Sequence, residues 1–201
     1  MLRLASIVEG HGEVEAVPIL IRRIARMVDP TLFIRTDPVL RVPSSRLLKS
    51  GEIERHVELA ARKNAGLGGV LILLDCDDGC PAKEGPALLA RAQGARPGFP
   101  VSVVLAQREF ESWFLAAAES LRGRRGLPPD LAGPSDPESI RGAKEWLRAR
   151  MPRDRSYAES IDQPKFTDAF DIDQARCRAR SFDRCHREIV RLLKLIRDDG
   201  V

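Results

Sequence analysis

Acidic side chains follow two aliphatic stretches of this 201-residue chain, residues 2–8 and residues 70–74, at the points where the stretches end. The five carboxylates are Glu9, Glu13, Asp75, Asp77 and Asp78. Several anions in one crevice repel one another, and a divalent cation removes that repulsion. Carboxylate oxygens are hard ligands that suit Mg²⁺ or Mn²⁺. We therefore expect a Mg²⁺ or Mn²⁺ site wherever the fold brings these side chains together.

Each acidic group also has an ordinary structural explanation. A carboxylate at Glu13 stabilises the start of a helix, because the amino end of a helix carries partial positive charge. Asp78 lies in an Asp-Asp-Gly sequence, which is a common turn composition in contact with water. The metal interpretation is favoured by the two groups jointly, since each one directly follows an aliphatic strand.

The order of hydrophobic patterns predicts strands that alternate with helices. Residues 2–8, 70–74 and 100–105 are aliphatic runs that suit buried strands, and residues 32–36 suit a further short strand. Strands separated by helices are parallel and joined by right-handed crossovers. The sequence thus predicts an α/β, Rossmann-like fold with a mainly parallel sheet flanked by helices. In such a sheet, the loops that leave the carboxyl ends of the strands line the ligand crevice.

Helical patterns and breaks divide the chain into three parts. Apolar residues recur at three- and four-residue steps in residues 14–28, and further helices are expected at 51–63, 86–96, 138–151 and 181–197. Glycine and proline clusters fill residues 122–137. We expect an α/β core over residues 1–121, a loop or linker over 122–137, and a basic helical extension packed on the core over 138–201.

Positive charge is concentrated in the last third of the chain. The formal charge is +4, and residues 1–138 carry equal numbers of basic and acidic side chains, so the excess lies in residues 139–201. Four arginines recur there at helical spacing: Arg180, Arg184, Arg187 and Arg191. This row is a candidate phosphate-binding face, and an ordinary solvated helix surface explains it equally well. His11, between two glycines, is a candidate phosphate contact or a turn residue exposed to water.

Two motifs in this chain resemble the signature motifs of the Toprim domain, the Mg²⁺-dependent module of topoisomerases, bacterial-type primases and OLD-family nucleases. They are Val8-Glu9-Gly10-His11-Gly12-Glu13 and Leu73-Leu74-Asp75-Cys76-Asp77-Asp78-Gly79. The tail is similar to an uncharacterised bacterial Toprim-like family in residues 109–113, in Tyr157, in residues 162–167 and in residues 181–183. The resemblance spans nearly the whole chain and implies a Toprim-like fold.

The resemblance also implies roles for individual residues. Glu9 matches the Toprim glutamate that acts as a general acid or base or as a metal ligand, and Asp75 and Asp77 match the aspartate pair that binds Mg²⁺. Glu13 matches a further glutamate of nuclease-type domains, where it serves catalysis and a second ion. Glu109 and Glu111 have no counterpart in the minimal pattern and are expected as added ligands, as is Asp78 from its position.

Hydrolysis of a phosphodiester in DNA or RNA is the activity that this set of residues would support. A topoisomerase needs a nucleophilic tyrosine, and the only tyrosine, Tyr157, lies outside the predicted core. The alternative is a Toprim-fold binding or regulatory module without turnover. The chain contains no ATP-binding Gly-x-x-x-x-Gly-Lys-Ser/Thr loop, so any ATP dependence implied by the resemblance would come from a separately encoded ATPase. We expect a cytoplasmic protein with no membrane partner, because no targeting segment or membrane span is visible.

Overall fold

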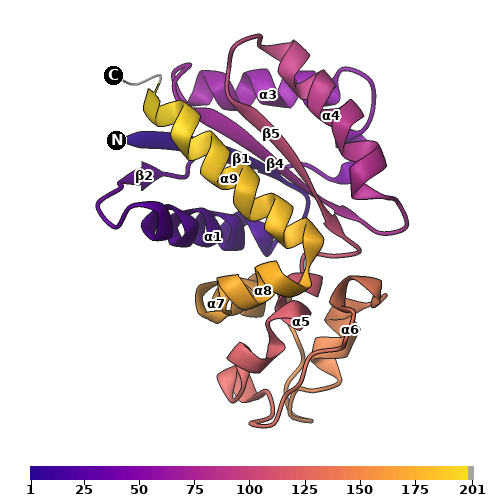
Figure 1. Ribbon diagram of the computed structural model, residues 1–201. Coiled ribbons are helices and arrows are strands. Elements are labelled where there is room, and N and C mark those ends of the chain that lie inside the picture. The colour runs from indigo at the N-terminus through magenta and orange to yellow at the C-terminus, as the bar shows by residue number, and fades with distance from the viewer. Residues whose placement is uncertain (199–201) are drawn as a thin grey trace.

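The computed structural model describes residues 1–198 and contains one parallel sheet between two layers of helices (Figure 1). The strands are β1 (Leu2–Val8), β2 (Ile34–Arg35), β3 (Val39–Arg41), β4 (Gly69–Cys76) and β5 (Val101–Gln107). Their order is β2-β1-β4-β5, with β3 also paired to β1, and every pairing is parallel. The predicted α/β, Rossmann-like architecture is confirmed.

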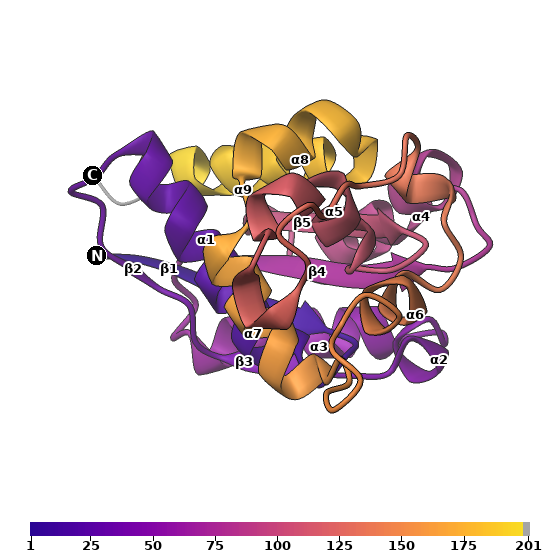
Figure 2. The same cartoon turned by 90° about the horizontal axis from the view of Figure 1, so that it is seen from below.

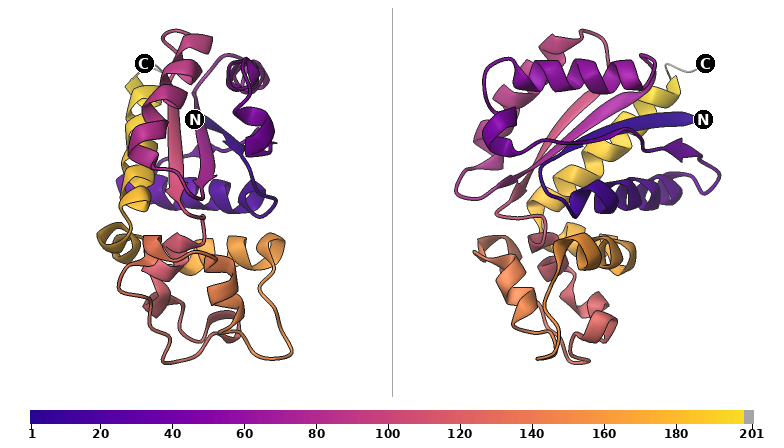
Figure 3. Two further views of the ribbon diagram at one scale, coloured as in Figure 1. Left: turned by 90° about the vertical axis from the view of Figure 1, so that its right-hand side faces the viewer. Right: turned by 180° about the vertical axis from the view of Figure 1, so that it is seen from behind.

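Two helices cover each face of the sheet (Figure 3). They are α1 (Glu13–Val28) and α9 (Arg180–Asp198) on one face, and α3 (Glu52–Lys63) and α4 (Pro81–Ala95) on the other. β4 separates the two layers by simple alternation: Leu71 and Leu73 pack into the α1 and α9 layer, whereas Val70 and Ile72 pack into the α3 and α4 layer. An unbroken aliphatic run is therefore required in this central strand.

The remaining helices form a lobe below the carboxyl ends of the strands (Figure 2). They are α5 (Ser112–Ala116), α6 (Ala143–Arg148), α7 (Glu159–Ala169) and α8 (Ile172–Arg178), and the short α2 (Ser44–Leu47) follows β3. Aromatic rings hold the lobe to the sheet, because Phe110, Trp113 and Phe114 are buried against Phe166 and Phe182. Residues 122–137 run along this lobe as loops and short 3₁₀ turns.

Several helix boundaries differ from those predicted. α4 begins at Pro81 instead of residue 86, because a proline at the first position of a helix loses no hydrogen bond. The helix expected over 138–151 is restricted to α6, since Gly142 takes a left-handed φ of 72° immediately before it. α7 and α8 were not predicted. None of the helices within residues 1–198 has the length and apolar character that a bilayer crossing requires.

Candidate functional site

Four acidic residues that follow β1, β4 and β5 meet at the carboxyl edge of the sheet. The register sets Val8 of β1 beside Leu73 of β4, and Asp75 of β4 beside Ala106 of β5. The chain that leaves each strand therefore emerges at the same edge, next to the helical lobe. We call Glu13, Asp75 and Glu111 the acidic cluster, and Glu9 lies at its border.

Glu13 is the first residue of α1 and is turned back onto the loop that precedes the helix. One of its carboxylate oxygens accepts hydrogen bonds from the backbone N–H groups of Glu9 (2.9 Å) and Gly10 (3.1 Å). Its exposed fraction is only 2%. Glu9 itself accepts a hydrogen bond from the hydroxyl of Ser44 at the start of α2. The turn between β1 and α1 thus holds two carboxylates in fixed positions.

Asp75 enters the cluster from β4 and is tied to the chain that follows β5. Its Oδ1 accepts a hydrogen bond of 2.9 Å from the backbone N–H of Phe110. Arg108 makes the sharp turn between these segments: its φ is +68°, and its backbone N–H bonds to the carbonyl of Cys76 at 3.0 Å. This turn carries residues 109–111 back towards Asp75.

Glu111 is completely buried and receives partners from the last third of the chain. Its Oε1 accepts a hydrogen bond of 2.8 Å from the hydroxyl of Tyr157 and one of 3.4 Å from the side-chain amide of Gln163. Its Oε2 is buried and has no hydrogen-bond partner within the described residues. An orphaned carboxylate oxygen in such a place is an available ligand position, because an unpaired buried acceptor is costly.

Burial and mutual repulsion shift the acidity of the whole cluster. Burial raises the pKa of Glu13 to about 7, with a further contribution from the charge of Glu9 and opposition from its two amide hydrogen bonds. Burial, followed by the charges of Glu13 and Glu111, raises the pKa of Asp75 well above its usual range. Burial likewise raises the pKa of Glu111 to about 7, although Lys144 and Tyr157 act in the opposite direction. At neutral pH the cluster therefore favours a proton or a cation.

Lys144 of α6 supplies positive charge beside the cluster. Its Nζ forms an ion pair of 2.8 Å with Glu159, and its charge lowers the pKa of Glu13, Asp75 and Glu111. Burial acts to lower the pKa of Lys144, and the surrounding carboxylates outweigh burial and raise it. The side chain is 30% exposed and lines a cavity of about 550 Å³. The cavity walls are His11, Lys144, Glu145, Arg148, Tyr157, Glu159 and Ser160.

The structure brings together only part of the predicted ligand set. Glu9, Glu13, Asp75 and Glu111 converge, whereas Asp77 is exposed and Asp78, 70% exposed, pairs with Arg141 at 2.6 Å. The chain turns away after Cys76, and this turn sends both aspartates to solvent. The side chain of Glu109 accepts a hydrogen bond of 3.3 Å from the backbone N–H of Lys144 instead.

A preformed metal centre is not present in residues 1–198, where no three acidic, histidine or cysteine side chains surround one point as metal ligands do. The type of donor still fits a hard divalent cation, because the cluster offers carboxylate oxygens of raised pKa and one orphaned oxygen. A cation would be held only after side-chain rotation.

The predicted nucleic-acid contacts divide into two groups. His11 is exposed and lines the cavity beside Lys144. The four arginines project from α9, but Arg191 is engaged with the carbonyl of Val101 and the hydroxyl of Ser102, at 3.0 and 2.7 Å. Arg180, Arg184 and Arg187 line a second cavity away from the acidic cluster.

Sequence reasoning missed the basic and hydrogen-bonding partners of the cluster. Lys144 and Glu159 were not singled out, and Tyr157 and Gln163 entered only through the family resemblance, with Tyr157 also considered as a nucleophile and neither given a role at the acidic cluster. Nothing local marks these residues, because they lie far along the chain from the acids that they contact. The one signal that could have pointed to this set was Gln163, a polar residue on a helical face that the fold buries.

Comparison with known protein families gives a match over most of the chain. A family model described as a domain of unknown function, DUF4276, matches residues 8–189. The match includes all the residues of the acidic cluster and its partners. No curated protein and no solved structure matches the chain.

Proposed function

Because the chain belongs to the DUF4276 family of unknown function, we propose its activity from the site itself: hydrolysis of phosphodiester bonds in nucleic acid, dependent on Mg²⁺ or Mn²⁺. The observation that carries this proposal is the convergence of Glu13 and Asp75 from two parallel strands, with the charge of Glu13 raising the pKa of Asp75. Carboxylates arranged in this way are stabilised by a cation. The resemblance of both motifs to Toprim nucleases supports the same conclusion.

Asp75, Glu13 and Glu9 are the residues that would hold the cation, and Glu111 would offer its orphaned oxygen as a further ligand. When bound, a divalent cation polarises a phosphate and lowers the pKa of a water molecule. The ligand set differs from the one implied by the Toprim resemblance, because Asp77 is replaced by Glu111. Asp77 stays at the surface, where it can contact the substrate strand only from outside the cluster.

The other residues of the site would bind and orient the substrate. Lys144 faces both the cluster and the cavity, so its ammonium group would attract a phosphate to the carboxylates and stabilise negative charge on it. His11 and Arg148 on the cavity wall would contact flanking phosphates. Tyr157 holds Glu111 in place, and its hydroxyl is occupied by that hydrogen bond, which argues against a tyrosine nucleophile.

A cleavage assay on the full chain tests this proposal. Plasmid, linear DNA and RNA are incubated with the protein and Mn²⁺ or Mg²⁺, and Mn²⁺ binding is measured separately by calorimetry. We expect Asp75→Asn and Glu13→Gln to lower the cleavage rate by about 100-fold or more, since even residues behind a metal ligand contribute about 10- to 100-fold. Asp130 is an exposed acid in the loop region of residues 122–137. Asp130→Asn is therefore the matched control, and we expect it to retain full activity.

Two outcomes would reject the proposal. One is that the protein neither cleaves nucleic acid nor binds Mn²⁺, which would favour the binding or regulatory module. The other is cleavage that survives in both variants at the rate of the Asp130→Asn control. The cytoplasmic location and the separately encoded ATPase belong to this same proposal, and the ATPase is implied by the Toprim resemblance.

A further inference from the structure

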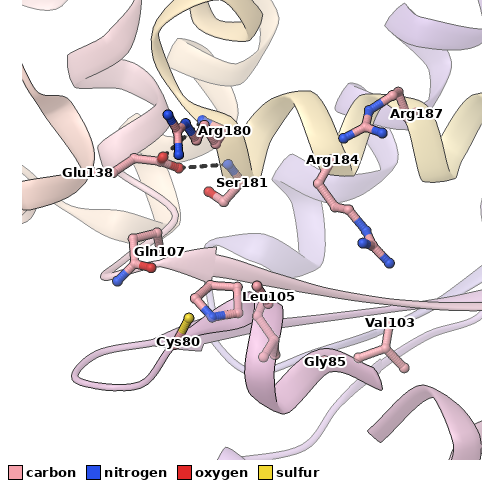
Figure 4. Close-up of a pocket in the computed structure, with 12 residues that line it drawn as sticks. Cys80, Gly85, Val103, Leu105, Gln107, Glu138, Arg180, Ser181, Arg184 and Arg187 are labelled. Atoms are coloured by element: carbon pink, nitrogen blue, oxygen red, sulfur yellow. Dashed lines mark hydrogen bonds between the residues drawn. The ribbon is translucent and has the colours of Figure 1, made fainter. Parts of the chain in front are cut away.

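A second cavity lies beside the free edge of β5, between α4 and α9 (Figure 4). Its volume is about 310 Å³, which is at the lower end of the range for small-molecule sites. Its walls are Cys80, Pro81, Ala82 and Gly85 of the α4 segment, Val103, Leu105 and Gln107 of β5, and Glu138, Arg180, Ser181, Arg184 and Arg187. None of these residues belongs to the acidic cluster or contacts it through a hydrogen bond of the described chain.

The α9 wall of this cavity has an excess of positive charge. It carries three arginines, and the one acid beside them, Glu138 of the 3₁₀ turn Pro137–Ser139, accepts hydrogen bonds from the backbone N–H groups of Arg180 and Ser181 at 2.8 and 2.9 Å. Glu138 therefore caps the start of α9. In Figure 4 the side chain of Arg184 extends from α9 towards β5, and the guanidinium of Arg187 lies above the same space.

Arg184 and Arg187 each share their acidic partner with another arginine. Arg184 contacts Glu188 at 3.4 Å, and that carboxylate already holds Arg191 at 2.8 Å. Arg187 contacts Asp183 at 2.9 Å, an acid that it shares with Arg176. The two arginine side chains are 50% and 65% exposed, so a phosphate group can compete with these carboxylates for them. Arginine then offers two parallel donors to the phosphate oxygens.

The opposite wall of the cavity is apolar and open. Pro81, Ala82 and Gly85 of α4 line it together with the aliphatic side chains of Val103 and Leu105. Gly85 contributes to this openness, because a Cβ added there would meet no atom within 4 Å. The amino end of α4, a helix of 15 residues, lies at the same cavity and adds positive electrostatic potential.

We propose that this cavity binds one nucleotide, with the phosphate held by Arg184 and Arg187 and the base lying on the apolar wall. A phosphate by itself would use the arginines and leave the apolar wall empty. The ligand must therefore combine an anionic group with a flat apolar body. A cavity of this volume accepts a single such unit, and the unit is either a free nucleotide or one residue of a nucleic acid strand. The inference does not rest on the phosphodiesterase activity.

Titration of the full chain with 5′-AMP, inorganic phosphate and a single-stranded oligonucleotide, followed by calorimetry without divalent cations, tests the inference. Gly85→Leu fills the cavity from α4, and Gly94→Leu is its matched control on the same helix, since a Cβ at Gly94 also meets nothing. The Arg184→Gln/Arg187→Gln double variant removes the phosphate contacts. Its control is Arg62→Gln, which removes an equivalent exposed pair with Glu58 on α3.

We expect about tenfold or greater weakening of nucleotide binding in Gly85→Leu and in the double variant, and no change in either control. If AMP binds and the oligonucleotide does not, the ligand is a free nucleotide, and if only the oligonucleotide binds, the ligand is a nucleotide within a strand. Equal binding of both supports a site for one nucleotide from either source. The inference is overturned if neither binds, if Gly85→Leu binds as well as Gly94→Leu, or if inorganic phosphate binds as tightly as AMP. Loss of binding here with intact cleavage, or the reverse, separates this site from the acidic cluster.

Discussion

Tyr157 donates a hydrogen bond of 2.8 Å to Glu111, and both side chains are buried. This contact joins the loop before α7 to the acidic cluster below the sheet. Because Glu111 lies directly after the turn that carries Phe110 to Asp75, the hydrogen bond also fixes the position of Asp75 indirectly. The extension and the core therefore build the candidate site together.

Tyr157→Phe tests that contact. The substitution keeps the ring and leaves Oε1 of Glu111 with only the long hydrogen bond from Gln163, so we expect a loss of about 1–3 kcal/mol in the free energy of unfolding. Denaturant unfolding monitored by circular dichroism measures the loss. Cleavage activity should fall without disappearing, because the hydroxyl positions a carboxylate and does not attack the substrate. Complete and selective loss of activity in a stably folded variant would contradict this role.

Asp75→Asn should make the cation-free protein more stable. The carboxylate is repelled by Glu13 and Glu111, whereas an amide at this position removes the repulsion and still accepts the hydrogen bond from Phe110. We expect a gain of about 1 kcal/mol at pH 8, measured by thermal melts in EDTA. Mn²⁺ should stabilise the natural protein and not the variant. Asp77 is an exposed neighbour, so Asp77→Asn is the control. It should leave the melting temperature unchanged both in EDTA and with Mn²⁺.

The stability of the cation-free protein should fall as the pH rises from 5 to 8. The pKa values of Glu13 and Glu111 are about 7 in the folded protein, against 4.5 for an ordinary glutamate. The folded chain therefore binds more protons than the unfolded chain in this interval, and the stabilisation present below pH 4.5 is lost as the pH passes 7. The full effect is roughly 3 kcal/mol per carboxyl group.

Denaturant titrations in EDTA across this pH range measure the slope. Glu13→Gln should reduce the dependence of the free energy of unfolding on pH. Saturating Mn²⁺ should abolish the remaining dependence, because the cation replaces the proton. A flat profile for the natural protein without cations would show that the cluster is not protonated at neutral pH.

Gly12→Ala should be strongly destabilising. Its φ is −68°, so the backbone is ordinary, but an added Cβ would lie 2.1 Å from Oε1 of Gln163 and 2.6 Å from the carbonyl oxygen of Glu159. To relieve this clash α1 must move away from α7, which would lower the free energy of unfolding by about 1–3 kcal/mol or more. Gly10→Ala is the matched control from the same turn, since its Cβ would lie 3.4 Å from Glu13 in ordinary contact. Equal melting temperatures for the two variants would contradict the close approach of the helices.

The sequence by itself determined the layers of this protein and the edge of the sheet at which its acidic residues meet. Aliphatic runs such as residues 70–74 specify buried strands wherever they occur, and the alternation of strands with helices requires parallel pairing. Acids placed at the carboxyl ends of two of these strands must then share an edge, as Asp75 near the end of β4 and Glu13 in the segment after β1 do. These conclusions need only local patterns, because each depends on neighbours within a few positions.

Tertiary structure alone decided which acids join and what surrounds them. Glu111 enters the cluster because Arg108 turns the chain sharply after β5, and Asp77 leaves it because the chain turns away after Cys76. No local pattern distinguishes those two acids. Lys144 and Tyr157 reach the site through packing of the helical lobe beneath the sheet. The raised pKa values also have this origin, since burial and like charge are produced by the folded arrangement of segments remote in sequence.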